Sequence, residues 1–287
     1  MTLNNRAAEL PSCRAAKILV TGAKGMLGQD LCPILEDNGY EVVETDVDTL
    51  DITKDCREFI SNIKPDLVIH CAAYTNVDKA EEDLETARLI NVVGTENIAK
   101  ACAENDIPLV YISTDYVFDG NKCEPYTADD IPNPLNNYGL TKFQGEEAIK
   151  KYCTKYYIAR TSWLYGHHGK NFVETMISLA DKAELKVVDD QIGCPTWTVE
   201  LANGIIKLLN KPFGTYHICG SGSTSWYGFA KEIFEQEDLK VNLKPCTTEE
   251  FPRPAKRPKY SIMDNNGTTR DWRSALKDYL ALREAAE

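Results

Sequence analysis

Tyr138 and Lys142 carry the clearest chemical signal in the chain. They are four residues apart in a predicted helix and therefore share one of its faces. An ammonium close to a phenol favours the phenolate, which predicts a Tyr138 pKa below its ordinary value of about 10. Such a tyrosine can deliver a proton to a carbonyl oxygen, and the hydroxyl of Thr114 can hydrogen-bond the same oxygen. The three residues predict proton transfer at a carbonyl group.

A glycine-rich loop near the start of the chain predicts a dinucleotide site. It follows the apolar run 17–21 and precedes a predicted helix. Glycines permit a tight turn and a close backbone approach, and the N-terminus of a helix attracts a pyrophosphate. This context favours a cofactor loop over an ordinary strand-to-helix turn. We expect the cofactor to contact Gly22, Gly25, Met26, Leu27 and Gly28.

Acidic residues after the second predicted strand, 41–45, bear on the choice of cofactor. Asp46 is placed to bind the adenosine ribose, which favours NAD. Asp51 and Ile52 are alternatives that would flank the adenine. No arginine lies between the glycine loop and Asp51, although Lys24 could approach a 2′-phosphate. The sequence leaves NADPH and NADH both open.

Small residues follow the buried strand predicted at 67–70. Ala72 and Ala73, with Tyr74 after them, would let the backbone pass close to a cofactor, although simple packing at a strand end explains them equally well. Tyr138 and Lys142 are expected to touch the cofactor as well.

The alternation of short apolar runs with amphipathic ones predicts an α/β fold, a Rossmann doubly wound parallel sheet with a smaller α/β substrate-binding lobe. Predicted strands are 17–21, 41–45, 67–70, 109–113 and 156–160, and predicted helices are 28–38, 54–63, 84–105 and 137–153. In the less regular second half we predict helices at 171–183 and 199–209 and strands at 186–188 and 215–218.

We divide the chain into a poorly ordered extension (1–16), a dinucleotide-binding domain (17–160) and a lobe (161–287) that mainly binds substrate. A crossing of the chain between the lobes is left open. Substrate is expected between the lobes, at the carboxyl ends of the strands.

Composition excludes several classes of protein. The 287 residues carry a formal net charge of -12, which argues against a nucleic-acid partner. No run of 18 apolar residues occurs, so no membrane span is predicted. The 10 cysteines are scattered without a Cys-x-x-Cys pair or zinc spacing, which indicates reduced thiols, a cytoplasmic protein and no metal site. The chain is expected to be a monomer or a homodimer.

Several stretches, taken in order, resemble the extended short-chain dehydrogenase/reductases, and among them the dTDP-4-dehydrorhamnose reductases. The matching stretches are 20–28, 72–81, 113–120, 138–142, 160–166 and 190–196. The resemblance implies NAD(P)H-dependent reduction of the 4-keto group of dTDP-4-dehydro-L-rhamnose. It gives the catalytic positions to Thr114, Tyr138 and Lys142, and it implies substrate contacts by Thr114, Asp115, Tyr116, Trp163, Thr196 and Arg257.

Two features refine this expectation. A sister branch of nucleotide-sugar dehydratases follows the same threonine with Asp-Glu, whereas here Tyr116 follows Asp115, which favours simple ketone reduction. Arg257 belongs to the one dense basic stretch, 253–259, and could pair with a diphosphate. Two alternatives stay open: a reductase or epimerase for another nucleotide sugar, and a non-catalytic subunit resembling the regulatory subunit of methionine adenosyltransferase.

Overall fold

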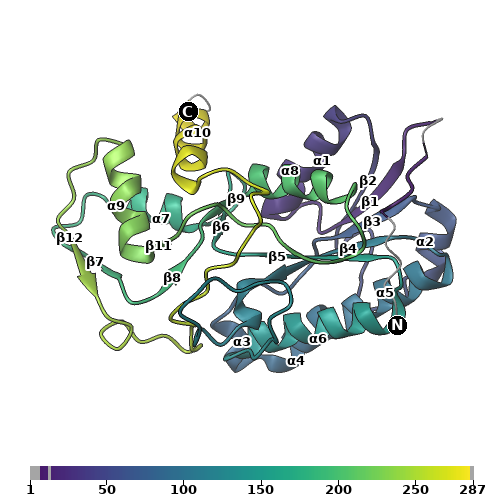
Figure 1. Cartoon of the computed structure of the whole chain (residues 1–287), viewed down its shortest axis with the longest axis horizontal. Helices are drawn as coiled ribbons and strands as arrows, with labels where there is room; N and C mark the ends of the chain where they lie inside the picture. Colours follow the sequence, from purple (N-terminus) through teal and green to yellow (C-terminus); the bar gives the residue numbers. More distant parts are fainter. Residues whose placement is uncertain (1–6, 12–13, 285–287) are drawn as a thin grey trace.

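A six-stranded parallel sheet forms the centre of the protein (Figure 1). The computed structural model describes residues 7–11 and 14–284. The strand order is β10-β5-β4-β3-β1-β2, and every neighbouring pair is parallel. The strands are β1 (Lys17–Thr21), β2 (Glu41–Thr45), β3 (Leu67–His70), β4 (Leu109–Thr114), β5 (Tyr156–Thr161) and β10 (Gly214–His217). The predicted α/β parallel fold is confirmed.

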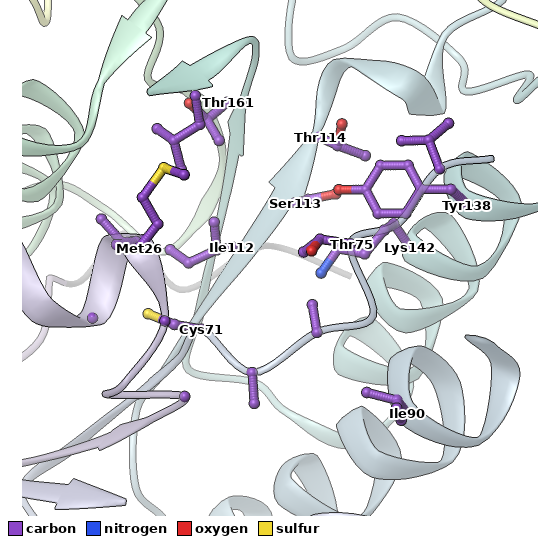
Figure 2. A pocket seen from close by; sticks show the side chains of 18 of the residues that line it. Met26, Cys71, Thr75, Ile90, Ile112, Ser113, Thr114, Tyr138, Lys142 and Thr161 are labelled. Carbon is purple, nitrogen blue, oxygen red and sulfur yellow. The ribbon is translucent and has the colours of Figure 1, made fainter. Parts of the chain in front are cut away.

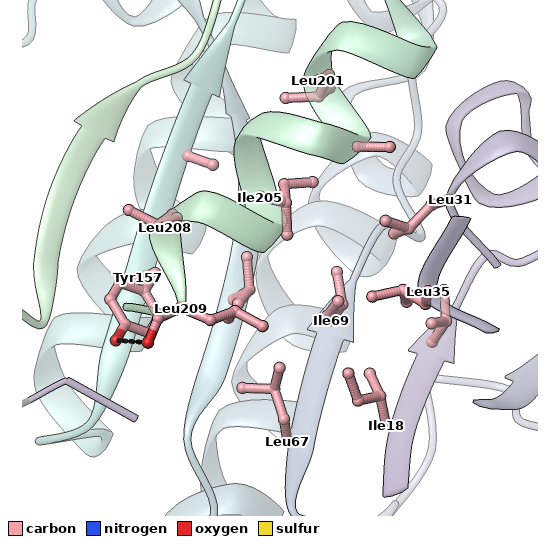
Figure 3. Close-up of a cluster of buried hydrophobic side chains, with 14 of the residues drawn as sticks. Ile18, Leu31, Leu35, Leu67, Ile69, Tyr157, Leu201, Ile205, Leu208 and Leu209 are labelled. Carbon is pink, nitrogen blue, oxygen red and sulfur yellow. Dashed lines mark hydrogen bonds between the residues drawn. The ribbon is translucent and has the colours of Figure 1, made fainter. Parts of the chain in front are cut away.

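Helices cover both faces of this sheet. On one face, α1 (Met26–Asp37) and α8 (Thr198–Leu208) bury leucine and isoleucine side chains against the strands, as Figure 3 shows. The other face is covered by α2 (Arg57–Ile63), α5 (Thr95–Glu104) and α6 (Asn137–Tyr152). Because β3 is buried at every position, its sequence is a continuous apolar run ending in His70.

The predicted elements of the first half are confirmed within a few residues, with one internal difference. The single helix predicted at 84–105 is instead α4 (Leu84–Arg88), a π-helical segment (Leu89–Gly94) and α5. A short helix, α3 (Lys79–Glu82), precedes it. The π-helical segment matters for the site, because it places Asn91 inside the fold.

The chain returns to the sheet after residue 160. The helix predicted at 199–209 and the strand predicted at 215–218 exist as α8 and β10, yet both belong to the large sheet and its core. The chain thus crosses between the lobes after residue 160, a crossing that the sequence left open. The division of the chain at residue 160 otherwise stays a prediction.

The second lobe has its own aromatic core, at the left of Figure 1. It contains α7 (Phe172–Ser178), α9 (Trp226–Gln236) and α10 (Trp272–Glu284). Three pairs of short strands complete it: β6 (Leu164–Tyr165) with β9 (Thr196–Trp197), β7 (Leu185–Val188) with β12 (Leu243–Cys246), and β8 (Ile192–Gly193) with β11 (Thr224–Ser225).

The predicted N-terminal extension, 1–16, falls partly outside the described residues, because 1–6 and 12–13 are not among them. Its described part contacts the sheet. Ala8 and Leu10 pack against the core, and the Ala8 amide donates a hydrogen bond to the Tyr157 hydroxyl at 2.9 Å. Within residues 7–11 and 14–284, no helix combines the length and apolar character needed to cross a membrane.

Candidate active site

A cavity of about 800 Å³ opens at the carboxyl ends of the parallel strands. Segments that follow β1, β2, β3 and β4 line it, together with α6 and residues of the second lobe (Figure 2). Most of the predicted site residues meet there: Gly22, Gly25, Met26, Leu27, Gly28, Asp46, Asp51, Ile52, Ala72, Ala73, Thr114, Asp115, Tyr116, Tyr138, Lys142 and Trp163. Tyr74, Thr196 and Arg257 do not line it.

The glycine loop is built for close approach. Gly22 has φ +69°, and a Cβ atom there would lie 2.7 Å from the Ala72 amide nitrogen. A Cβ on Gly28 would lie 2.5 Å from the Gly22 carbonyl oxygen. Gly25 precedes the first turn of α1, so free amides of that turn point toward the cavity. The loop therefore fits a pyrophosphate, which needs close backbone and helix N–H groups.

Acidic side chains line the far end of the cavity. The Asp46 carboxylate accepts hydrogen bonds from the Lys24 amide at 3.0 Å and the Val47 amide at 2.8 Å, which fix its orientation. The Lys24 ammonium pairs with Asp48 at 2.5 Å. Asp51 is held by Thr53, and hydrogen bonds from that side chain lower its pKa. Asp46 is thus preset to accept hydrogen bonds from ribose hydroxyls.

Tyr138 and Lys142 extend from α6 toward the end of β4, where Ser113 and Thr114 lie (Figure 2). Burial lowers the pKa of Lys142 to about 7 and raises the pKa of Tyr138 to about 12, although a hydrogen bond with Thr114 partly offsets the second effect. The sequence-based expectation of a lowered Tyr138 pKa was therefore wrong, because desolvation of the phenolate outweighs the effect of the Thr114 hydrogen bond. Tyr138 is a protonated phenol at neutral pH, as a proton donor requires.

Thr114 and Asp115 form a small polar group at the end of β4. The Thr114 hydroxyl donates to Asp115 Oδ1 at 3.1 Å and accepts from the Tyr116 amide at 3.2 Å. Asp115 is 2% exposed, and its Oδ2 atom has no hydrogen-bond partner among the described residues. Burial raises the pKa of Asp115 to about 7. Asp115 lines the cavity beside Thr114, although its Oδ2 atom is itself buried.

Aromatic rings form the second-lobe wall of the cavity. Trp163 adopts φ +46° and stacks on Trp226, with ring centroids 3.6 Å apart. Gly193 packs against the Trp163 indole, where a Cβ would lie 2.5 Å from the ring. The Tyr116 ring meets the Tyr138 ring edge-on at 5.9 Å. The fixed Trp163 ring offers a flat apolar surface suited to the C–H face of a sugar.

Three predicted site residues lie away from the cavity wall. Thr196 is fully buried in β9, where its hydroxyl accepts a hydrogen bond from the Gly220 amide at 3.1 Å. Tyr74 is half-buried, and its backbone is held by Asn91. Arg257 donates to Asp78 at 2.8 Å, so its nearest anion is a carboxylate of the protein itself.

Asn91 and Trp226 are among the residues of the site that sequence reasoning missed. Asn91, 1% exposed, accepts from the Tyr74 amide at 2.8 Å and donates to the Tyr74 carbonyl at 3.1 Å and to Thr141 Oγ1 at 3.1 Å. It thereby links the loop after β3 to α6. Trp226 lines the cavity behind Trp163. For Asn91, the available signal was a lone asparagine between apolar residues of a predicted helix.

The described residues contain no group of three or more histidine, cysteine, aspartate or glutamate side chains that could hold a metal ion. His70 is buried between Thr21 and Thr95, and burial lowers its pKa to about 3, so it is a neutral hydrogen-bonding residue of the core.

Comparison with known proteins agrees with this geometry. The RmlD substrate binding domain family matches residues 16–284. The spore coat polysaccharide biosynthesis protein SpsK of Bacillus subtilis is 43% identical over 94% of this chain and 99% of its own length. A dTDP-4-dehydrorhamnose reductase structure from Clostridium acetobutylicum is 49% identical, with a TM-score of 0.91, and covers 93% of this chain and 99% of its own.

A second solved structure, the dTDP-4-dehydrorhamnose reductase of Bacillus anthracis in complex with NADP, is 43% identical with a TM-score of 0.90. The match covers 93% of this chain and 99% of that chain. The chain therefore belongs to the RmlD substrate binding domain family, among whose relatives are the dTDP-4-dehydrorhamnose reductases.

Proposed function

We propose that the protein reduces the 4-keto group of dTDP-4-dehydro-L-rhamnose with NAD(P)H to give dTDP-L-rhamnose. One observation carries the proposal: Thr114, Tyr138 and Lys142 lie on one cavity wall with the glycine loop at its edge. The relatives named as this reductase, which match almost the whole chain, support the choice of substrate.

A bound nicotinamide supplies the hydride, and the residues of the chain supply orientation and the proton. The Thr114 hydroxyl orients the carbonyl oxygen. The Tyr138 phenol, kept protonated by its burial, donates its proton to that oxygen as the carbon is reduced. The Lys142 ammonium stabilises the negative charge that remains on Tyr138 and holds the cofactor ribose.

The remaining contacts divide between cofactor and sugar nucleotide. We assign the cofactor to the glycine loop, Asp46, Asp51, Ile52 and the backbone of residues 72–74. We assign the sugar to Thr114, Asp115, Tyr116 and Trp163, which line the cavity beside Tyr138. We further propose a cytoplasmic enzyme, active as a monomer or a homodimer.

The test is oxidation of NADH and of NADPH, measured separately, with enzymatically generated dTDP-4-dehydro-L-rhamnose. Tyr138→Phe is expected to reduce kcat by about 100-fold or more, because the proton donor is lost. Tyr152→Phe is the matched control, since Tyr152 lies at the other end of α6 and donates to Glu96 at 2.7 Å. Folded wild-type protein that binds NAD(P)H without turnover would favour another keto-sugar or the non-catalytic subunit.

A further inference from the structure

A buried ion pair that the mechanism above does not use lies beside the catalytic residues. Glu146 is 0% exposed and Arg160 is 1% exposed. Arg160 Nε donates to Glu146 Oε1 at 2.9 Å, and Arg160 Nη2 donates to Oε2 at 2.7 Å. The Ser113 hydroxyl donates to Oε1 at 2.6 Å. One carboxylate therefore receives three hydrogen bonds from two strands.

These bonds join the elements that carry the proton-transfer groups. Glu146 lies on α6, one helical turn after Lys142 and two turns after Tyr138. Ser113 is the residue before Thr114 on β4, and Arg160 lies opposite Ser113 on β5. A shift of α6 along the sheet would break these bonds, so the carboxylate fixes the distance between Thr114 and Tyr138.

Stability alone does not explain such a pair. Replacement of a buried ion pair by apolar residues of similar volume is often neutral or stabilising, because desolvation offsets the attraction. Removal of one partner is costly, since it leaves the other charge buried and uncompensated. A fully buried carboxylate one turn from a buried ammonium therefore calls for a role in the site.

Among the described groups around Lys142, Glu146 is the one that carries a negative charge at neutral pH. They are His70 of β3, Cys71 after β3, Tyr111 of β4, and Tyr138 and Glu146 of α6 itself. Burial raises the pKa of Cys71 and of Tyr111 and lowers that of His70, so all three are neutral at pH 7. Burial likewise keeps Tyr138 neutral. Glu146, paired with Arg160, is the carboxylate whose charge favours the Lys142 ammonium.

We propose that Glu146 is a positioning residue that fixes Thr114 against Tyr138 and holds Lys142 in its charged form. The charge of Glu146 counteracts the burial of Lys142, so that the ammonium persists at neutral pH. This inference rests on the proposed reductase function for its kinetic readout, whereas its binding readout requires only NADPH.

The experiment compares Glu146→Gln with Glu147→Gln. Glutamine keeps the shape and an oxygen acceptor but removes the charge. Glu147 is the matched control, because it is the next residue of α6 and its exposed side chain pairs only with Lys150, at 3.0 Å, among the interactions described for it. Both kcat/KM with the keto-sugar and the Kd of NADPH are measured from pH 5.5 to 9.

For Glu146→Gln, the alkaline decline of kcat/KM should move about one pH unit toward acid, because Lys142 loses its proton more readily. At pH 8 this corresponds to a loss of about tenfold. The pH at which NADPH affinity declines should move in the same direction. Glu147→Gln should leave both profiles unchanged.

The double variant Glu146→Gln/Arg160→Met separates the effect of the Glu146 charge from the effect of disrupted packing. It also allows the test to proceed if Glu146→Gln alone does not fold. It removes the uncompensated guanidinium, so it should fold while keeping the acid-shifted profiles. Wild-type profiles in the double variant, or an equal loss at every pH in Glu146→Gln, would overturn the proposal. Wild-type protein that binds NADPH without turnover would instead contradict the reductase function, and the NADPH profiles would still test Glu146.

Discussion

At the residue scale, the structure determines the protonation states of individual residues, and Asp115 is the clearest case. Asp115 is buried, and its pKa is raised to about 7. An unfolded aspartate releases its proton near pH 4. Between about pH 4 and pH 7 the folded state therefore binds more protons than the unfolded state, and ∂ΔG/∂pH of unfolding is negative. The cost of keeping Asp115 protonated in the folded state therefore grows as the pH rises through this window.

Asp115→Asn should accordingly stabilise the protein more at pH 8 than at pH 4.5, because asparagine never ionises and still offers Thr114 an oxygen acceptor. The difference should be on the order of a few kcal/mol. Thermal unfolding at the two pH values measures it, with exposed Asp129→Asn as the control. A stabilisation of equal size at both values would show that Asp115 is ionised throughout.

Most residues that line the cavity around Tyr138 and the glycine loop were predicted from the sequence, whereas their charge states could not be. Tyr138 and Lys142 are recognisable by their spacing on one helix face, and the glycine loop by its position after a strand. The pKa of Tyr138 is raised by burial and, to a smaller extent, by the charge of Asp115, while a hydrogen bond with Thr114 lowers it; all three effects come from residues distant in the sequence. Local spacing reveals that the Lys142 ammonium is near Tyr138, but it does not reveal that Tyr138 is buried.

At the scale of elements, the π-helical segment Leu89–Gly94 carries a testable role. It places Asn91 where its side-chain amide hydrogen-bonds the backbone N–H and C=O of Tyr74 and the Thr141 hydroxyl of α6. Asn91→Ala should leave the half-buried Tyr74 amide without its side-chain partner, at a cost of about 1 kcal/mol of stability. The loop after β3 should loosen, and the Kd of NADPH, measured by its fluorescence, should rise.

The control is Asn203→Ala, because the Asn203 side chain bonds only the Val199 carbonyl one turn earlier, at 2.9 Å, on the exposed side of α8. An unchanged Kd in Asn91→Ala would contradict the role of this loop in cofactor binding. Strands and ordinary helices were predictable here because apolar periodicity determines them. The π-helical segment was not, since its run of apolar residues does not distinguish it from an α-helix.

At the scale of the whole molecule, the parallel sheet was predicted from the sequence, whereas the return of the chain to that sheet was left open and its place was not identified. Strand β10 is a short run of partly buried residues, and its place beside β5 follows from pairing over more than fifty residues. Elements α9 and α10 and the short strands other than β7 were likewise not predicted. Their hydrophobic faces meet one another across the second lobe, so no local pattern identifies their partners.

Asp78 connects the two parts of the molecule. It follows the loop that lines the cavity after β3, and it accepts hydrogen bonds from Arg253 at 2.6 Å and Arg257 at 2.8 Å, both from the basic stretch. Arg257 also hydrogen-bonds the Tyr116 side chain on the cavity wall. Burial opposes ionisation of Asp78, yet the hydrogen bonds from Arg257 and Arg253 lower its pKa to about 2.

Because this pKa is depressed, the contribution of Asp78 to stability is present above pH 4 and is lost only as the pH falls toward 2. Asp78→Asn should therefore lower stability by about 1–3 kcal/mol, equally from pH 5 to pH 8, since Arg257 loses its carboxylate partner. The KM of the nucleotide sugar should rise about fivefold or more, corresponding to about 1 kcal/mol. Glu82→Gln, on the exposed side of α3, is the control for loss of a negative charge. If Asp78→Asn loses stability while its KM stays at the wild-type value, the hydrogen bonds of Asp78 with Arg253 and Arg257 hold the lobes together without shaping the sugar-nucleotide site.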